Sequence, residues 1–186
     1  NQGPKIIAHR GVHQIYAGAD RGADTCTAGQ IAPMTHSHIA NTIPSIAAAF
    51  DAGADIVEVD VHLTADGHFA VFHDWTLDCQ TNGTGVTHKQ GMAYLRTLDL
   101  GYGYTMDGDT FPLRGTAVGD MPTLGEIFES GDVSGQILVN FKGDRVREGV
   151  TLADRNKGTA TPIWGVYGGD APTRAAMDAT DWTGFG

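Results

Sequence analysis

Basic residues are scarce in this chain. Its 186 residues include 12 Lys and Arg against 22 Asp and Glu, which gives a formal net charge of -10 at pH 7. The summed field repels nucleic acids and anionic membranes, and no run of Lys and Arg offsets it. Long apolar runs are also missing, because no stretch approaches the roughly 18 apolar residues of a membrane-spanning helix. We therefore expect neither a nucleic-acid partner nor a membrane span.

Cysteine is also scarce, with two in the chain. Cys26 lies in a polar, glycine-rich segment and Cys79 in the turn-rich sequence Asp-Cys-Gln-Thr-Asn-Gly-Thr-Gly, so both belong to loops. We expect a Cys26–Cys79 disulfide, which would imply an oxidising compartment. Two cysteines alone do not decide the matter, and two free thiols remain the alternative.

The first third of the chain predicts a strand, a long loop and a helix. Residues 5–9 form a short apolar run that enters a His-Arg-Gly turn, as a buried parallel strand does. Residues 12–40 have no clean period, which predicts a long loop insertion. A helix follows, because Thr42 is a good N-cap, Pro44 suits the first turn, and apolar side chains repeat at helical spacing up to Gly53.

Strands dominate the predictions for the rest of the chain. Residues 55–64 alternate apolar and polar side chains, which indicates a strand whose apolar face packs under helices. After a tight turn at 65–67, residues 69–73 predict a third strand. The remaining predicted elements are a helix near 89–98, a helix opened by the capping box Thr123–Glu126, a strand at 136–142, and a strand at 161–167 closed by Gly168-Gly169. This order predicts an α/β fold with a parallel sheet covered by helices.

Polar side chains recur at the carboxyl ends of four predicted parallel strands. Barrel enzymes place their chemistry at such strand ends, because helices cover the other surfaces. The residues in question are His9 and Arg10, Glu58 and Asp60, His73 and Asp74, and Asn140 and Lys142.

Glu58 and Asp60 are candidate metal ligands. They stand two residues apart on one strand, so their carboxylates project to the same side and repel each other unless a cation lies between them. Oxygen ligands without cysteine favour a hard ion such as Mg²⁺ or Ca²⁺. The alternatives are two solvated carboxylates, or ion pairs with Arg10 and Lys142.

His9, His73, Arg10 and Lys142 together provide the groups that phosphodiester cleavage needs. One histidine can take a proton from the nucleophile while the other protonates the leaving alkoxide. Arg10 can bind two phosphate oxygens at once, and Lys142 acts as a point charge. Taken singly, each histidine is more often structural, and the remaining histidines, the His36-Ser-His38 pair included, are expected to be solvated loop residues.

Several motifs agree in order and spacing with one known family. They are His9-Arg10-Gly11, Asn41-Thr42, Gly53-Ala54-Asp55-Ile-Val-Glu58-Val-Asp60-Val, Thr64-Ala-Asp66-Gly67, Val71-Phe-His73-Asp74 and Thr81-Asn-Gly83-Thr-Gly85. In these motifs the chain resembles the glycerophosphodiester phosphodiesterase family. The resemblance is specific through residue 85 and weaker from Gly101 to Lys142.

This resemblance implies a (β/α)₈ TIM-type barrel that forms a single domain over residues 1–186. It implies hydrolysis of a small-molecule glycerophosphodiester to glycerol 3-phosphate and an alcohol, with one divalent cation, Mg²⁺ or Ca²⁺, on Glu58 and Asp60. The acid/base pair would be His9 and His73, with Arg10 and Lys142 at the phosphate. The loop that contains Cys26 is similar to that of the periplasmic or secreted bacterial branch. We therefore expect that location, with a signal peptide outside these residues.

The chain departs from the family pattern at two positions and in length. Ala40 stands where the family usually has Glu, and Asn140 replaces a carboxylate that often serves as a third metal ligand. Asn140 can coordinate only weakly, through its neutral carbonyl oxygen. A barrel of this type needs about 250 residues, and the segment between Lys142 and the strand at Thr161 looks too short for a complete βα unit. We therefore expect an incomplete barrel, with further segments outside these residues.

Two other functions fit the same residues. A phospholipase D of the sphingomyelinase type resembles this family in its two histidines and Glu-x-Asp ligands, although no aromatic cage for a choline headgroup can be assigned. The chain could also be a non-catalytic protein that binds phosphoesters or metal ions, with Ala40 and Asn140 marking lost activity. Turnover of a glycerophosphodiester separates these alternatives.

Overall fold

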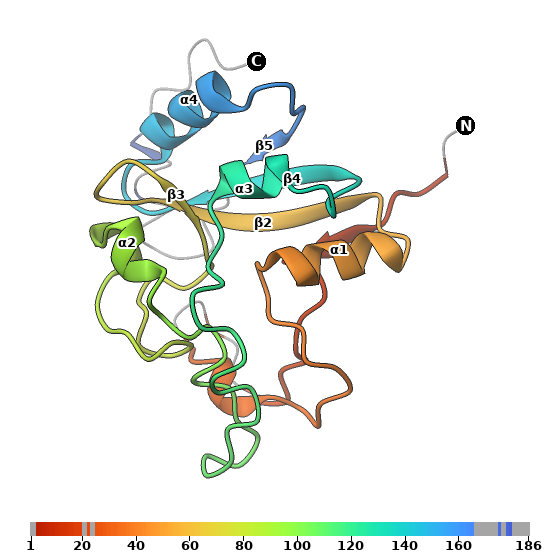
Figure 1. The fold of residues 1–186 in the computed structure, drawn as a ribbon, viewed down its shortest axis with the longest axis vertical. Coiled ribbons are helices and arrows are strands. Elements are labelled where there is room, and N and C mark those ends of the chain that lie inside the picture. The colour runs from red at the N-terminus through yellow and green to blue at the C-terminus, as the bar shows by residue number, and fades with distance from the viewer. Residues whose placement is uncertain (1–2, 20–21, 23–24, 166–174, 176–177, 180–186) are drawn as a thin grey trace.

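The computed structural model describes residues 3–19, 22, 25–165, 175 and 178–179 (Figure 1). A five-stranded sheet lies at its centre, with the strand order β1-β2-β4-β5 and with β3 paired to β2. In chain order the named elements are β1 (Ile7–His9), η1 (Ala28–Gln30), α1 (Ile43–Asp51), β2 (Ile56–Leu63), β3 (Phe69–Val71), η2 (Thr87–Lys89), α2 (Met92–Leu95), α3 (Leu124–Glu129), β4 (Gln136–Lys142), α4 (Val146–Asn156) and β5 (Ile163–Gly165).

Helix α1 forms where its sequence signals place it. The Thr42 side chain accepts a hydrogen bond from the Ser45 backbone N–H at 3.4 Å, and Pro44 occupies the first turn. The chain leaves the helix through Gly53, whose φ of +96° is costly for a residue with a side chain. The predicted capping box at Thr123 and Glu126 is likewise present at the start of α3.

Strand β3 corrects one prediction. The sequence pattern was interpreted as a third parallel strand, but β3 pairs antiparallel with β2, with Val61 opposite Val71. The turn at 65–67 explains the difference. It closes a hairpin in which the Thr64 N–H bonds the His68 carbonyl at 2.8 Å, whereas a parallel pair needs a crossover of a dozen or more residues.

Helix α4 corrects a second prediction. The segment between Lys142 and Thr161 was expected to be too short for a βα unit, yet it holds all of α4 and leads into β5, which is parallel to β4. Val146, Val150 and Ala153 form the buried face of the helix at helical spacing. Gly149 lets α4 approach the sheet closely, because a Cβ there would lie 3.1 Å from the Phe141 ring.

Two other predicted elements are shorter in the structure. The helix expected near 89–98 is reduced to η2 and the four-residue α2. The strand expected at 161–167 is observed at Ile163–Gly165, and its predicted end with Gly168-Gly169 lies outside the described residues. Among the described residues of the 12–40 segment, the short turn η1 is the one named helix or strand.

Two apolar cores stabilise the molecule. One lies between the sheet and helices α1, α3 and α4 and includes Val57, Val59 and Val61 of β2. The other lies where the 12–40 and 76–120 segments meet, below the sheet in Figure 1, and includes Ile31, Leu77 and other buried apolar side chains. A disulfide between Cys26 and Cys79 joins these two segments. The 12–40 and 76–120 segments thus pack against each other as a second layer with its own apolar core.

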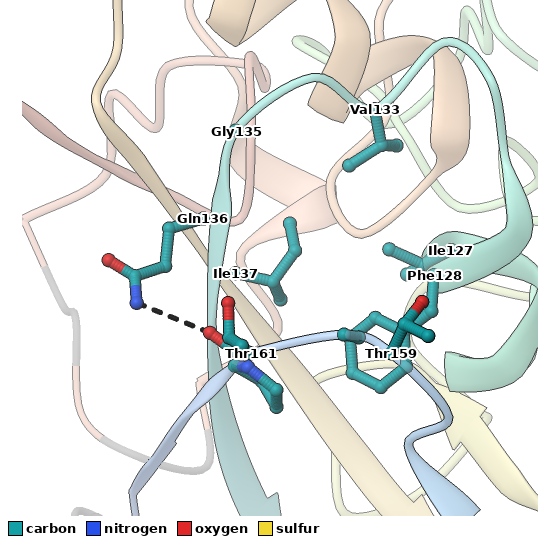
Figure 2. Close-up of a pocket in the computed structure, with 10 residues that line it drawn as sticks. Ile127, Phe128, Val133, Gly135, Gln136, Ile137, Thr159 and Thr161 are labelled. Carbon is teal, nitrogen blue, oxygen red and sulfur yellow. Dashed lines mark hydrogen bonds between the residues drawn. The ribbon is translucent and has the colours of Figure 1, made fainter.

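A small pocket lies at the amino end of β4, away from the polar strand ends. Its volume is about 220 Å³, and Figure 2 shows Ile127, Val133 and Ile137 among its lining residues, with the Gln136 side-chain amide donating to the Thr161 carbonyl at 3.3 Å. None of the described residues that line it is charged. In the described part of the chain, no helix has the length and apolar character required to cross a membrane.

We predict that removing the disulfide destabilises the protein. The bridge joins residues 53 positions apart, and a cross-link of that span lowers the entropy of the unfolded chain by an amount worth about 2–4 kcal/mol. Urea unfolding of the Cys26→Ser/Cys79→Ser variant should show this loss. Adding a reductant should destabilise the parent to the same level and leave the variant unchanged. Equal unfolding midpoints for parent and variant would contradict the prediction.

Candidate active site

Strand pairing brings the predicted site residues close together, on both sides of the central strand β2. Strand β4 occupies one edge of β2 from Ile56 to His62, while β1 and β3 share the opposite edge. β1 ends opposite Glu58, and β3 arrives from the other direction and ends opposite Val61. His9 and His73 therefore leave their strands beside the same short gap, which explains how an antiparallel β3 still delivers His73 to the site.

The turn after β1 is sharply constrained. Arg10 has a φ of +61°, and its backbone N–H bonds the Glu58 carbonyl at 2.8 Å. Gly11 follows with a φ of +78°, and a Cβ there would lie 2.8 Å from the backbone of Ser45. The Ser45 hydroxyl donates to the Arg10 carbonyl at 3.1 Å. Only glycine fits at position 11, and the turn aims the Arg10 side chain at β2.

Asp60 is the most heavily bonded side chain of the site. Arg10 Nε lies 3.2 Å from its Oδ2, and Lys142 Nζ lies 3.7 Å from its Oδ1. The Asn140 amide donates to Oδ1 at 3.1 Å. Burial alone would raise the pKa of this carboxyl, but the charges of His73, Arg10 and Lys142 hold it below its ordinary value. Asp60 is therefore ionised inside the protein.

Asn41 is a site residue that the sequence analysis named only as part of the Asn41-Thr42 motif shared with the family. Its φ is +62°, a conformation that asparagine tolerates better than most residues. Its amide donates to Asp60 Oδ2 at 3.2 Å, and its carbonyl oxygen accepts the Asp60 backbone N–H at 3.1 Å. A short polar residue before a helix cap was the available signal, but only the fold shows that it contacts Asp60.

Glu58 lies two residues from Asp60 in a very different environment. Burial and the neighbouring negative charge of Asp60 raise the pKa of Glu58 to about 7. Among the described residues its buried Oε2 has no hydrogen-bond partner, and His9 Nε2 is 3.9 Å away. The charge of Asp60 is thus balanced by Arg10 and Lys142, whereas Glu58 retains an oxygen without a hydrogen-bond partner among the described residues.

The two candidate acid/base histidines are held differently. The His9 ring is 61% exposed. Desolvation of its buried part and the charge of Arg10 lower its pKa to about 4, an effect that solvent screening weakens but does not reverse. His9 is therefore neutral at pH 7 and able to accept a proton. The His73 Nδ1 lies 2.7 Å from the Asp74 carboxylate, which orients the ring as the third member of a catalytic triad orients its base.

The site chemistry fits a hard divalent cation held by few protein ligands. In the described ranges of the chain no group of three or more His, Cys, Asp and Glu side chains could hold a metal ion. Mg²⁺, however, is commonly bound through one or two carboxylates, with water and substrate phosphate completing the shell. The unpaired Oε2 of Glu58 suits such an ion. The Asn140 amide nitrogen faces Asp60, so a ligand role for its oxygen requires the amide to turn.

Comparison with known proteins points to one family. The family model described as "Glycerophosphoryl diester phosphodiesterase family" matches residues 9–170. A glycerophosphodiester phosphodiesterase of Caldanaerobacter subterraneus is 38% identical over 113 residues, which cover 60% of this chain and 41% of the relative. A probable glycerophosphodiester phosphodiesterase 1 of Mycobacterium tuberculosis is 41% identical over 98 residues, covering 53% and 28%. The chain thus matches 41% or less of the length of these curated relatives.

Solved structures agree on the fold. A glycerophosphodiester phosphodiesterase from Agrobacterium tumefaciens superimposes with a TM-score of 0.58 at 24% identity, over 94% of this chain and 61% of that one. A phosphodiesterase from Oleispira antarctica, solved with the product sn-glycerol-3-phosphate, gives 0.57 at 22% identity, over 95% and 62%. The mainly parallel sheet with its covering helices is therefore part of a (β/α)₈ barrel, as the family resemblance implied. With its family match spanning most of its length, this chain belongs to the glycerophosphoryl diester phosphodiesterase family.

Proposed function

We propose that this chain hydrolyses glycerophosphodiesters to glycerol 3-phosphate and an alcohol. The observation that carries the proposal is the convergence of two histidines, His9 and His73, and two cations, Arg10 and Lys142, around the buried Asp60. Membership of the family and the bound product in the Oleispira antarctica relative support the choice of substrate.

The phosphate group would bind between Arg10 and Lys142. Both cations are held by the buried Asp60, so their heads are positioned before substrate arrives. A phosphodiester carries a single negative charge, which two adjacent cations attract locally although the whole chain has a net charge of -10. During the reaction the same cations would stabilise charge on the phosphoryl oxygens.

Proton transfer would fall to the two histidines. Neutral His9 is suited to take the proton from the attacking oxygen, which belongs to water or to the glycerol hydroxyl of the substrate. His73, oriented by Asp74, would donate a proton to the oxygen of the leaving alcohol. The net change adds one water across the P–O bond and leaves a phosphate monoester and a free alcohol.

A divalent cation, Mg²⁺ or Ca²⁺, would be held by Glu58 and Asp60, with the Asn140 oxygen as a weak neutral ligand. When bound, such an ion supplies Lewis-acid stabilisation of negative charge. Its binding would also satisfy the Glu58 Oε2 that has no hydrogen-bond partner among the described residues. The exchange of a carboxylate for Asn140 leaves one fewer charged ligand, so we expect modest metal affinity.

We also propose that the protein works in the periplasm or outside the cell. The Cys26–Cys79 disulfide supports this location, because such bonds persist in oxidising compartments and are rare in the cytosol.

The test of function is release of glycerol 3-phosphate from glycerophosphocholine, first with EDTA and then with Mg²⁺ or Ca²⁺ restored. We expect metal-restored turnover, and a fall of at least about 100-fold in kcat for His9→Ala and His73→Ala, because each removes a proton-transfer group. His68→Ala provides a matched control, since His68 is an exposed histidine on the β2–β3 hairpin.

Three outcomes would count against the proposal. The site would lie elsewhere if four variants all kept full turnover: His9→Ala, His73→Ala, Glu58→Ala and Asp60→Ala. Cleavage of sphingomyelin or lysophosphatidylcholine without cleavage of glycerophosphocholine would move the function to the lipid-directed class. Binding of glycerol 3-phosphate by a folded protein that turns over no substrate would indicate a non-catalytic relative.

The carboxyl of Glu58 gives a pH-dependent prediction for the metal-free protein. Its pKa rises from 4.5 to about 7 in the folded state, so the folded protein holds this proton more tightly than the unfolded chain. Stability should therefore fall as the pH rises from about 4.5 to about 7. Glu58→Gln should lose this component, and the parent minus variant difference in unfolding free energy, measured with EDTA, isolates it.

Metal addition provides the control for this prediction. At pH 8, Mg²⁺ or Ca²⁺ should raise the melting temperature of the parent, because the cation replaces the missing proton on Glu58, and should have a much smaller effect on Glu58→Gln. Parallel pH profiles and equal metal responses for the two proteins would refute the assignment.

A further inference from the structure

Two buried histidines, His62 and His88, lie behind the site and have no part in the chemistry proposed above. Their rings are parallel, with centroids 5.7 Å apart and an interplanar angle of 6°. The Trp75 ring packs edge-on against His88 at 4.6 Å. Both imidazoles are almost completely buried, at 0% and 3% exposure. The sequence analysis expected both to be solvated loop histidines, and the structure corrects this, because it buries both side chains and places His62 on β2.

The His62 ring contacts the backbone of the candidate acid/base residue His73. Its Nε2 lies 3.4 Å from the His73 carbonyl oxygen. A carbonyl oxygen can only accept a hydrogen bond, so His62 Nε2 is the donor and its tautomer is fixed. The His73 side chain is already held by Asp74, and His62 adds a second, separate restraint on its main chain.

The His88 ring extends this contact toward the other side of the site. Its Nε2 faces the Asp144 carboxylate at 3.6 Å, and Asp144 also accepts a hydrogen bond from Lys89 Nζ at 2.7 Å. Asp144 stands two residues after Lys142 in the turn that ends β4. A continuous set of contacts therefore runs from the His73 backbone to the turn that follows Lys142.

Apart from the His62 contact with the His73 carbonyl, these supports come from three successive residues of the short turn η2. The Thr87 hydroxyl donates to the Asp74 carbonyl at 2.8 Å, His88 stacks on His62, and Lys89 binds Asp144. Each residue of η2 thus contacts a different segment that bears or adjoins a site residue. The contacts of η2 are mainly polar, and they are explained best by the site segments that they hold in place.

The chemistry of the pair is unfavourable for simple packing. Among the described residues neither His62 Nδ1 nor His88 Nδ1 has a hydrogen-bond partner, and both atoms are buried. A buried polar atom without a partner lowers stability, whereas an apolar ring of similar size would fill the same space without that cost. Packing alone therefore does not account for two imidazoles at this place.

We propose that His62 and His88 are positioning residues that hold His73 at a fixed distance from Lys142. His62 fixes the His73 main chain through its Nε2 donor, and His88 connects that restraint to the Lys142 turn through Asp144. This role rests on the proposed hydrolysis of glycerophosphodiesters, in which His73 protonates the leaving alcohol while Lys142 holds the phosphate. A fixed separation of the two groups keeps the proton donor in line with the scissile bond.

The test compares His62→Leu, which removes the donor, with His62→Gln, whose side-chain amide can still donate. We expect His62→Leu to lower kcat for glycerophosphocholine about 10-fold or more, with KM changed less than about 3-fold, because Arg10 and Lys142 still bind phosphate. His62→Gln should recover most of kcat. The exposed His68→Leu is the matched control and should behave as the parent.

His88→Phe is the second variant. It tests the positioning role even if His62→Leu does not fold. Phenylalanine fills the space and removes the contact with Asp144, so the unfolding midpoint should stay level or rise while kcat falls about 5-fold or more. Parent-like kcat in a folded His62→Leu or His88→Phe protein overturns the proposal. It is also overturned if neither variant folds, because the pair is then part of the core.

An independent readout separates this proposal from the proposed function. The ring ¹H and ¹³C signals of His73 can be recorded by NMR in the intact protein without substrate. They should shift and broaden in His62→Leu, return toward the parent in His62→Gln, and stay unchanged in His68→Leu. Unchanged His73 signals in His62→Leu would overturn the positioning role. A parent protein that hydrolyses no glycerophosphodiester would instead refute the function, whatever the signals show.

Discussion

The carboxylate of Asp60 is buried, with 1% of its side chain exposed, and it draws together segments that are far apart in the sequence. Four side chains contact its oxygens. Arg10 after β1 and Lys142 on β4 form ion pairs with Asp60, while the amides of Asn41 before α1 and Asn140 on β4 donate hydrogen bonds to it. An unpaired charge in the interior costs several kcal/mol, so the chain is most stable when these three segments meet at Asp60. The positions of the proposed phosphate-binding cations follow from that requirement rather than from apolar packing.

Glu58 lies on the same strand as Asp60, but its carboxyl is not surrounded by the protein's own cations and amides. Strand β2 directs both carboxylates to one side, yet the cations and amides surround Asp60, and Glu58 is left with a raised pKa and an unsatisfied oxygen. The two carboxylates therefore differ in role. Asp60 positions the protein's own cations, and Glu58 is open to a cation from solution. His9 and His73 reach this pair from either side because β1 and β3 end at the same gap along β2.

Local signals predicted the parts of the structure that local physics determines. The caps at Thr42 and Thr123, the alternation of β2 and the polar strand ends were all recognisable, and so was part of the site. The direction of β3 was also encoded, in a turn too short for a crossover, but was interpreted wrongly. The Asn41–Asp60 and His62–His88 contacts were not predictable, because residues 19 and 26 positions apart meet only once the loops follow their folded paths.

The dependence of the structure on Asp60 is measured most directly by urea unfolding of Asp60→Asn without metal at pH 7. Asparagine keeps the shape of the side chain but leaves Arg10 and Lys142 buried without their anion. We predict a loss of about 3–5 kcal/mol in unfolding free energy, against a negligible change for Asp109→Asn, which alters an exposed carboxylate. A loss below about 1 kcal/mol, within the range of an exposed ion pair, would contradict this account.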